Sequence, residues 1–248
     1  MSSTTYLITG ANRGLGRGLL EALIQRPNTT VIAGVRDPSN ESSKSLESLK
    51  TASGSKVITV KIDYNSLSTV NEAIQELQSK HNITSLDFVI ANAGISNCYA
   101  TAEATPLDQI REHYEINAVA TVALYQATIA LLKKSPKPVF VGMSSAIASI
   151  GDMEKVPAIT TAYGMSKAAL NYLVRKIHFE NPELVAFAIS PGWVQTDMGT
   201  FGAKSHGMED APVTLEQSVE GMLKKFDGAT REKTSGTFQS YDEATFAW

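Results

Sequence analysis

The stretch Thr9-Gly10-Ala11-Asn12-Arg13-Gly14-Leu15-Gly16 joins an apolar run at Thr4–Thr9 to a helical pattern at Gly14–Arg26, which Pro27 ends. Glycines at this point let the backbone turn tightly and leave room for a ligand to approach it closely. The N-terminus of the following helix would offer free N–H groups and positive potential to a pyrophosphate. The stretch therefore predicts a dinucleotide-binding turn, although glycine-rich strand-to-helix turns also form for purely structural reasons.

Along the rest of the chain, short β-branched runs alternate with longer amphipathic segments, which is typical of βα units and a parallel sheet. Further strands are expected at Thr29–Val35, Lys56–Ile62, Leu86–Ala91, Pro138–Ser144, Leu184–Ser190 and Gly236–Ser240. Helices are expected at Ser66–Lys80, Leu107–Lys134, Thr160–Phe179 and Leu215–Phe226, with a surface loop and a short helix within Asp37–Ser55. No repeat or change of composition divides the chain. We predict one domain over residues 1–248, a Rossmann-type α/β fold whose doubly wound parallel sheet is flanked by helices.

Composition narrows the class of protein. The chain has 22 basic and 25 acidic residues, so its charge gives no reason to expect a nucleic acid or an anionic membrane as partner. The first expected strand leaves no room for a signal peptide, and no apolar run approaches the ~20 residues of a membrane-spanning helix. Cys98 is the single cysteine, which fits a reducing compartment, and the four histidines show no metal-ligand spacing. We expect a cytoplasmic protein that binds no metal.

The end of the second expected strand bears on the choice of nicotinamide coenzyme. A site for NAD places a carboxylate there to bind the ribose hydroxyls, but this chain has Val35 followed by Arg36. A second guanidinium, that of Arg13, lies in the glycine-rich stretch, and two guanidiniums can bind a 2′-phosphate. We therefore predict NADP(H). Asp37 leaves the alternative open, because a shift of two residues would turn it into a ribose ligand.

Two more strands end in polar residues on the edge of the sheet where such folds bind ligands. Asp63 follows the third expected strand, and Asn92-Ala93-Gly94 follows the fourth. We expect these residues to contact the adenosine half of the coenzyme or to support the neighbouring strand.

Four polar side chains far apart in sequence indicate a reacting centre. Tyr163 and Lys167 are four residues apart, so a helix would place both on one face, where an ammonium would lower the phenol's pKa from about 10. Ser145 ends the fifth expected strand, and Asn117 lies within a long apolar helix, where it must be hydrogen-bonded, if only by a bulge in its own helix. Beside a dinucleotide, this set predicts proton transfer to a carbonyl oxygen, as in a ketone reductase or an alcohol dehydrogenase.

These motifs together resemble the short-chain dehydrogenase/reductase family. The segments TGANRGLG (9–16), ANAG (91–94), Ser144-Ser145, YGMSK (163–167) and PGWVQTDM (191–198), with Asn117, occur in the order and spacing of that family over essentially the whole chain. Within the family, NYLVRKIHFEN (171–181) and the segment that begins SGTFQSYD (235–242) resemble fungal reductases related to norsolorinic acid ketoreductase.

The resemblance implies a role for each residue of the reacting centre. Tyr163 would be the general acid that protonates the carbonyl oxygen, and Lys167 would bind the nicotinamide ribose and lower the phenol's pKa. Ser145, with Ser144 as the alternative, would hydrogen-bond the carbonyl oxygen, and Asn117 would hold a water that relays protons to Lys167.

The resemblance also implies coenzyme contacts. Beyond the loop residues Gly10, Asn12, Arg13, Gly14, Leu15 and Gly16, these are contacts of the nicotinamide with Pro191, Gly192, Val194 and Thr196. The alternative for Pro191-Gly192 is a plain turn.

The expected substrate surface is mostly apolar and includes a glycine-punctuated candidate lid at Gly199–Gly207. The apolar candidates are Ile95, Ala146, Ile147, Met153, Trp193, Met198 and Phe201. We expect NADPH-dependent reduction of a hydrophobic ketone or aldehyde, aromatic and polyketide-like carbonyl compounds included. The alternatives are an NAD-dependent alcohol dehydrogenase and a non-catalytic NADP-binding regulatory protein. Apolar residues beyond one stripe on Leu107–Lys134, together with the helix Thr160–Phe179, favour a homodimer or homotetramer.

Overall fold

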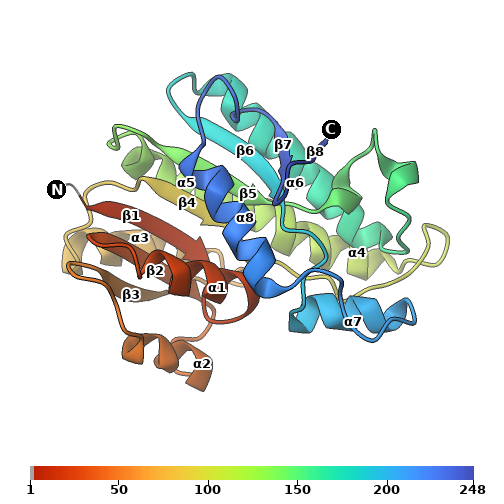
Figure 1. The fold of residues 1–248 in the computed structure, drawn as a ribbon, viewed down its shortest axis with the longest axis horizontal. Helices are drawn as coiled ribbons and strands as arrows, with labels where there is room; N and C mark the ends of the chain where they lie inside the picture. Colours follow the sequence, from red (N-terminus) through yellow and green to blue (C-terminus); the bar gives the residue numbers. More distant parts are fainter. Residues whose placement is uncertain (1–2) are drawn as a thin grey trace. The chain divides into compact units, whose positions relative to one another are not determined.

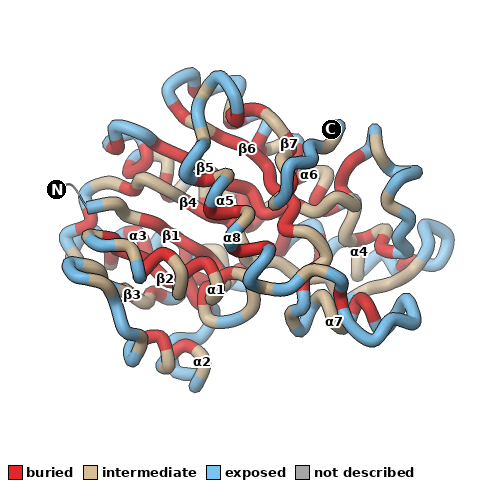
Figure 2. Tube along the Cα trace, in the orientation of Figure 1, coloured by how far each residue is buried: buried red, intermediate tan, exposed pale blue. Residues whose placement is uncertain are grey.

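Strand β1 is formed by Thr4–Thr9, whose β-branched and apolar residues suit a pleated strand. In this computed structural model, which describes residues 3–248, β1 pairs in parallel with β2 (Thr29–Val35) and with β4 (Phe88–Ala91). Strand β2 also pairs in parallel with β3 (Lys56–Lys61). All seven residues of β2 are buried, as expected for a strand covered on both faces (Figure 2).

The remaining strands are β5 (Val139–Met143), β6 (Val185–Ser190), β7 (Phe238–Ser240) and β8 (Thr245–Phe246). Strand β7 pairs in parallel with β6 and antiparallel with β8. The strand order in the described part of the chain is β3-β2-β1-β4-β5-β6-β7-β8. This order, with helices between the parallel strands, confirms the predicted α/β class. Among the strands of residues 3–248, only the short antiparallel β8 has no counterpart in the prediction.

The helices follow the strands in the alternation that the sequence predicted. The long ones are α1 (Gly14–Leu23), α3 (Ser68–Lys80), α5 (Ala120–Leu132), α6 (Thr161–Glu180) and α8 (Leu215–Asp227). The shorter ones are α2 (Glu41–Lys44), α4 (Leu107–Tyr114) and α7 (Asp197–Ser205). Single turns are η1 (Ser45–Ser48), η2 (Glu115–Val119), η3 (Ala146–Ala148) and η4 (Met153–Lys155), of which η2 is a π-helical turn.

The chain forms two compact units. The first unit contains the residues up to Ala93 together with Val122–Phe140, and the second contains Gly94–Thr121 together with Val141–Trp248. The glycine-rich turn lies in the first unit, and Asn117, Ser145, Tyr163 and Lys167 all lie in the second.

In the first unit, α1 and α3 cover opposite faces of the strands (Figure 1). Helix α1 buries Gly16, Leu19, Leu20 and Leu23, which recur at helical spacing on one face. Helix α3 buries the predicted face of Val70, Ala73, Ile74 and Leu77. The rings of Tyr6 and Phe88 stack between β1 and β4 with their centroids 4.7 Å apart.

In the second unit, a glycine sets how closely α6 packs against β5. A Cβ on Gly142 would lie 2.6 Å from Cγ2 of Val174 and 2.8 Å from Cδ2 of Leu170. Helix α8 lies on the opposite side of β6 from α6 (Figure 1), and its Phe226 ring contacts Phe187 of β6 at 6.2 Å between centroids. The close packing of α6 holds Tyr163 and Lys167 against the end of β5.

One helical segment is long and apolar enough to cross a membrane, although no such segment was expected from the sequence. The segment Leu107–Leu132, made of α4, η2 and α5, is 26 residues long and apolar enough by composition to count as a candidate membrane span. Half of its most apolar window is buried inside the protein. A single helix of this kind is weak evidence for a membrane, because core helices of soluble proteins share the property. Charged residues such as Asp108, Arg111 and Glu112 interrupt this segment, so the sequence contains no uninterrupted apolar run of that length there.

Candidate active site

The glycine-rich turn of the first unit has the backbone shape that a phosphate-binding loop requires. Gly10 and Gly14 have φ of +67° and +53°, the left-handed region that favours glycine. A Cβ on Gly16 would collide with the carbonyl oxygen of Gly10 and lie 2.6 Å from Nδ2 of Asn92. Helix α1 has no side-chain cap and no acidic residue in its first turn. Its N-terminus therefore keeps the positive potential that a pyrophosphate needs, and the residues present fit a dinucleotide.

Asn92 and Ala93 connect the ends of β4 and β1. The backbone N–H groups of both residues donate to Oγ1 of Thr9 at 3.1 Å, and Nδ2 of Asn92 donates to the carbonyl oxygen of Thr9 at 2.8 Å. Of the two interpretations from sequence, support of the neighbouring strand is the one visible in these contacts. Asp63 forms a local turn in which its Oδ1 accepts from the backbone N–H of Asn65 at 3.0 Å.

The segment after β2 is ordered around its serines. Asp37 accepts from the backbone N–H and the hydroxyl of Ser39, at 2.8 Å and 2.6 Å, and these bonds lower the pKa of its carboxyl group. Its carboxylate is thus already engaged in its own turn. Arg36 is exposed beside it, and Nδ2 of Asn12 donates to Oγ of Ser42 at 2.8 Å. The last bond links the glycine-rich turn to α2, a contact that sequence patterns did not indicate.

In the second unit, one face of α6 contacts three consecutive residues at the end of β5. The side chains of Tyr163 and Ser145 are hydrogen-bonded. One turn further along α6, Nζ of Lys167 donates to the carbonyl oxygen of Met143 at 2.8 Å. After another turn, Oδ1 of Asn171 accepts from the hydroxyl of Ser144 at 2.6 Å. Of the two candidate serines, Ser145 contacts Tyr163, whereas Ser144 is held by Asn171.

The electrostatics of this face differ from the sequence prediction. The pKa of Tyr163 is raised to about 12, chiefly by burial and to a lesser extent by nearby Tyr99, while the hydrogen bond from Ser145 acts in the opposite direction. Lys167 is 3% exposed, and burial lowers its pKa to about 8. Its Nζ lies 5.7 Å from the centroid of the Tyr163 ring and is bonded to a backbone carbonyl instead of the phenol. The expected lowering of the phenol's pKa by this ammonium is therefore wrong for the structure described.

Asn117 is fully buried at the centre of the π-helical turn η2. Its Oδ1 accepts from the backbone N–H of Ile95 at 2.8 Å, and its Nδ2 donates to the carbonyl oxygen of Ile95 and to Oγ of Ser166, both at 2.9 Å. The hydroxyl of Ser166 donates in turn to the carbonyl oxygen of Tyr163 at 2.8 Å. Asn117 thus connects the loop after β4 to the helical turn that carries Tyr163. Such single π-helical turns are frequently found at functional sites.

Gly94 leaves room at the same point. A Cβ there would lie 2.8 Å from Oδ1 of Asn117 and 3.3 Å from Nζ of Lys167. The structure thus places Gly94 beside two of the four residues of the predicted reacting centre.

The predicted nicotinamide-binding segment begins with a turn whose conformation favours glycine. Gly192 has φ of +83°, and the hydroxyl of Ser218 donates to the carbonyl oxygen of Pro191 at 2.7 Å. Val194 forms an isolated parallel bridge with Val213. The hydroxyl of Thr196 caps α7 by accepting from the backbone N–H of Gly199 at 3.2 Å. The candidate lid Gly199–Gly207 is mostly this helix, which the sequence did not predict because glycines interrupt its pattern.

Aromatic rings hold α7 to the loop after β4. Tyr99 contacts the rings of Phe201 and His206, with centroids 5.6 Å and 6.1 Å apart, and Trp193 contacts His206 at 5.5 Å. A Cβ on Gly202 would lie 2.8 Å from the hydroxyl of Tyr99. Sequence reasoning missed Tyr99, as it missed Ser166 and Asn171. The last two could have been found from their spacing of three from Tyr163 and four from Lys167.

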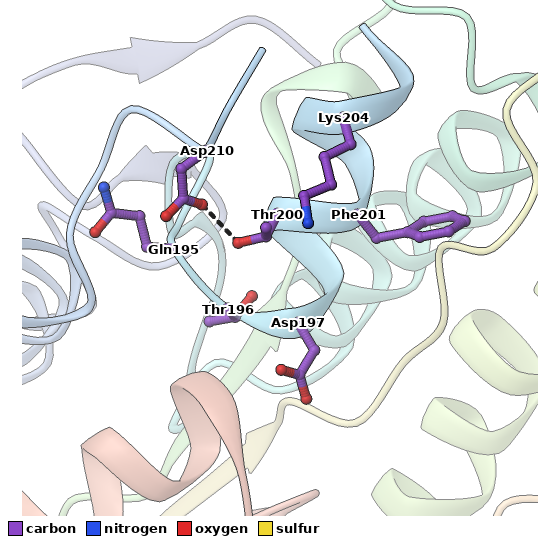
Figure 3. Close-up of a pocket in the computed structure, with 7 residues that line it drawn as sticks. All are labelled: Gln195, Thr196, Asp197, Thr200, Phe201, Lys204 and Asp210. Atoms are coloured by element: carbon purple, nitrogen blue, oxygen red, sulfur yellow. Dashed lines mark hydrogen bonds between the residues drawn. The ribbon is translucent and has the colours of Figure 1, made fainter. Parts of the chain in front are cut away.

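Thr196 also lines a cavity of about 500 Å³ beside α7 (Figure 3). Within it, the hydroxyl of Thr200 donates to Oδ1 of Asp210 at 2.5 Å, and Phe201 points to the other side of the helix. The lining is more polar than the substrate surface expected from sequence; it consists of Gln195, Thr196, Asp197, Thr200, Phe201, Lys204 and Asp210.

Residues 3–248 contain no group of three His, Cys, Asp or Glu side chains that could hold a metal ion. His113 is fully buried, with its Nδ1 2.7 Å from the carbonyl oxygen of Gln109 and its Nε2 accepting from the backbone N–H of Asn97 at 3.4 Å. Through these contacts the His113 side chain connects α4 to the loop after β4.

Comparison with known proteins identifies the family. The family model of the short chain dehydrogenases matches residues 4–205, and the chain belongs to this family. Norsolorinic acid ketoreductase nor1 of Dothistroma septosporum is 45% identical over 245 residues, which cover 98% of this chain and 91% of that protein. Norsolorinic acid ketoreductase of Aspergillus parasiticus is 44% identical, with 95% and 87% covered. The NADPH-bound carbonyl reductase from chicken fatty liver is similar in structure, with a TM-score of 0.87, 28% identity and 100% of both chains covered.

The buried Lys167 predicts a pH dependence of stability without coenzyme. Its folded pKa of about 8 lies below its usual value of 10.5, so between these values the unfolded chain binds a proton that the folded chain does not. Stability should therefore rise through this window, by up to about 3 kcal/mol. Above pH 10, Tyr163 acts in the opposite sense, because the unfolded chain loses the phenolic proton first.

Urea unfolding from pH 7.5 to 9.5 measures this difference. The free energy of unfolding of the wild type should increase relative to that of Lys167→Met as the pH rises, whereas the exposed control Lys233→Met should follow the wild type. Parallel curves for wild type and Lys167→Met would contradict the assignment.

Proposed function

We propose that this chain catalyses the NADPH-dependent reduction of a hydrophobic ketone or aldehyde to an alcohol, with Tyr163 as general acid. The observation that supports this most directly is the hydrogen bond between Tyr163 and Ser145 on a helix face that also buries Lys167. Two hydroxyl groups that meet in this way suit a single carbonyl oxygen, which accepts one hydrogen bond from each. Bound NADPH supplies the hydride in such a reaction.

The protonation states favour reduction. With a pKa of about 12, the phenol of Tyr163 carries its proton at neutral pH and can donate it to the carbonyl oxygen. Ser145 then stabilises the phenolate that remains, since a hydrogen bond from its hydroxyl favours the charged form. Lys167 contributes a buried amine near the ring, fixed in place by its bond to Met143. Asn117 and Ser166 hold the backbone of Tyr163, so the phenol is positioned from both sides.

NADPH is the coenzyme that the charge pattern supports. Arg36 is exposed after β2, and Arg13 precedes the N-terminus of α1. Asp37, the residue that would favour NAD, already accepts two hydrogen bonds from Ser39. The structurally similar carbonyl reductase from chicken fatty liver binds NADPH, in agreement with this preference.

For the substrate, exposed apolar side chains in the segments after β5 and β6 support an uncharged hydrophobic compound. Met153, Met198 and Phe201 are all exposed. The relatives at 44–45% identity are ketoreductases named for norsolorinic acid. We include aromatic and polyketide-like ketones among the candidate substrates of this chain on that basis.

Self-association through α6 is part of the proposal. Met165, Tyr172 and Phe179 are exposed and recur every seven residues along α6, and α4, which packs against α6, exposes Leu107 and Tyr114 at the same spacing. Such a stripe is typical of helices that pair with a partner. We propose a homodimer or homotetramer formed by these helices.

The substitution Tyr163→Phe tests the mechanism. Loss of the general acid should reduce kcat/KM for ketone reduction by about 10²–10⁴-fold, measured by the loss of NADPH absorbance. Tyr172→Phe is the matched control, because Tyr172 lies on the same helix and is 73% exposed. A Tyr163→Phe variant with wild-type turnover would exclude Tyr163 as the general acid. A wild type that oxidises an alcohol with NAD⁺ but does not reduce a ketone with NADPH would contradict the proposed direction of the reaction.

The substitution Arg36→Ala tests the coenzyme. Loss of a charge-assisted bond to the 2′-phosphate should raise KM for NADPH by roughly tenfold or more and leave KM for NADH nearly unchanged. Lys50→Ala removes an exposed cation elsewhere in the same unit and should change neither value. An equal rise of KM for both coenzymes in Arg36→Ala would show that Arg36 does not bind the 2′-phosphate.

Sedimentation velocity at micromolar concentration tests self-association. The wild type should sediment as a dimer or tetramer, and Tyr172→Glu combined with Phe179→Glu should sediment as a monomer, because a charge on an apolar interface is costly. Lys137→Glu, on an exposed site outside both helices, should leave the wild-type state unchanged. A monomeric wild type would remove this part of the proposal.

A further inference from the structure

The loop that follows Ser145 is fastened to a segment almost a hundred residues later in the chain. The hydroxyl of Ser149 donates to the carbonyl oxygen of Ala247 at 2.6 Å, and the backbone N–H of Ala247 donates to Oδ2 of Asp152 at 2.8 Å. The backbone N–H of Gly151 donates to the carbonyl oxygen of Trp248 at 3.1 Å. We call the contacts that join Ser149, Gly151 and Asp152 to Ala247 and Trp248 the loop latch.

Both sides of the latch are rigid. Ser149 is fully buried, and its Oγ also accepts from the backbone N–H of Asp152 at 3.0 Å. On the other side, Trp248 stacks on Phe238, a buried residue of β7, with ring centroids 5.8 Å apart. A Cβ on Gly151 would lie 2.8 Å from Cβ of Ala247, so the two segments approach as closely as a glycine allows. The latch therefore fixes the loop to the sheet.

The latch is connected to the reacting centre through η3. The backbone N–H of Ala148 donates to the carbonyl oxygen of Ser145 at 2.8 Å, and that of Ser149 donates to Ala146 at 3.1 Å. Ile147, in the middle of this turn, would lie 3.3 Å from a Cβ on Gly164, the residue after Tyr163. These contacts place the latched loop directly after Ser145 and beside the first turns of α6.

Two large apolar side chains of the latched loop lie exposed. Ile150 is 68% and Met153 58% exposed, although each adjoins a residue of the latch. Hydrogen bonds to Ser149 and Asp152 hold these side chains at the surface, where burial against an apolar ligand would stabilise the complex by about 25 cal/mol per Å².

We propose that the loop latch fixes Ile150 and Met153 as an apolar surface that binds the hydrophobic part of the carbonyl substrate, and that Asp152 is the positioning residue of this surface. The inference rests on the proposed ketone reduction and adds to it the element that selects bulky substrates. A short ketone would contact Ser145 and Tyr163 alone, whereas a polycyclic one would also cover the latched loop.

Steady-state kinetics with two ketones of different size test the latch. With naphthyl methyl ketone, Asp152→Ala should raise KM about five- to tenfold and leave kcat within about twofold, because only binding of the apolar part is weakened. With butanone, the same variant should keep the wild-type KM. Asp152→Asn keeps an oxygen that can accept from Ala247 and should restore the wild-type KM for the large ketone.

Lys155→Ala is the matched control. Lys155 binds Oδ1 of Asp152 at 2.7 Å but contacts no residue of 247–248 through its side chain, so its loss removes the ion pair and keeps the latch. Ser149→Ala and Trp248→Ala, which act on the latch from its two sides, should reproduce the effect of Asp152→Ala. Equal changes for both ketones, or a Lys155→Ala variant as impaired as Asp152→Ala, would overturn the proposal.

Backbone hydrogen exchange separates this proposal from the proposed function. The amides of Gly151 and Asp152 should exchange at least about tenfold faster in Asp152→Ala and Trp248→Ala than in the wild type and in Lys155→Ala. Unchanged exchange would show that the latch does not hold the loop, whatever the activity. A wild type inactive with both ketones would instead contradict the proposed function, even if exchange behaved as expected.

Discussion

A buried amine is the constraint on which the reacting centre depends. An ammonium removed from water is unfavourable unless it finds an acceptor, and Lys167 finds the carbonyl oxygen of Met143 at 2.8 Å. That bond can form only if α6 packs closely on β5, which Gly142 permits because it lacks a side chain. Once α6 is in this position, Tyr163 meets Ser145 and Asn171 meets Ser144. The geometry of the site thus follows from the need of the buried Lys167 amine for a hydrogen-bond acceptor.

Much of the fold could be predicted from sequence because strands buried on both faces leave an unmistakable apolar pattern. β1 and β2 begin and end where the sequence predicted, whereas β4 begins two residues later than Leu86. Helix α7 escaped prediction because Gly199 and Gly202 interrupt its pattern. Both glycines are needed for packing, since a Cβ on Gly202 would lie 2.8 Å from the hydroxyl of Tyr99.

Sequence patterns could predict that the residues of the candidate site lie together, but not the electrostatics of that site. Spacing indicates that Tyr163 and Lys167 share a helix face, yet it does not reveal that the amine is bonded to Met143 or that burial dominates both pKa values. Contacts between segments far apart in sequence could not be predicted either. Asn12 pairs with Ser42, and Asp152 accepts from the backbone N–H of Ala247; nothing in the sequence around Asn12 or Asp152 indicates these partners.

The parallel pairing of β6 with β7, and the short hairpin to β8, have a consequence for biosynthesis. The turn after Ser145 receives part of its hydrogen bonding from residues 247 and 248, which the ribosome makes about a hundred residues later. The contacts within the β1–β2–β3 layer join segments close in sequence, so a nascent chain can assemble that layer before residues 247 and 248 are available to the turn after Ser145.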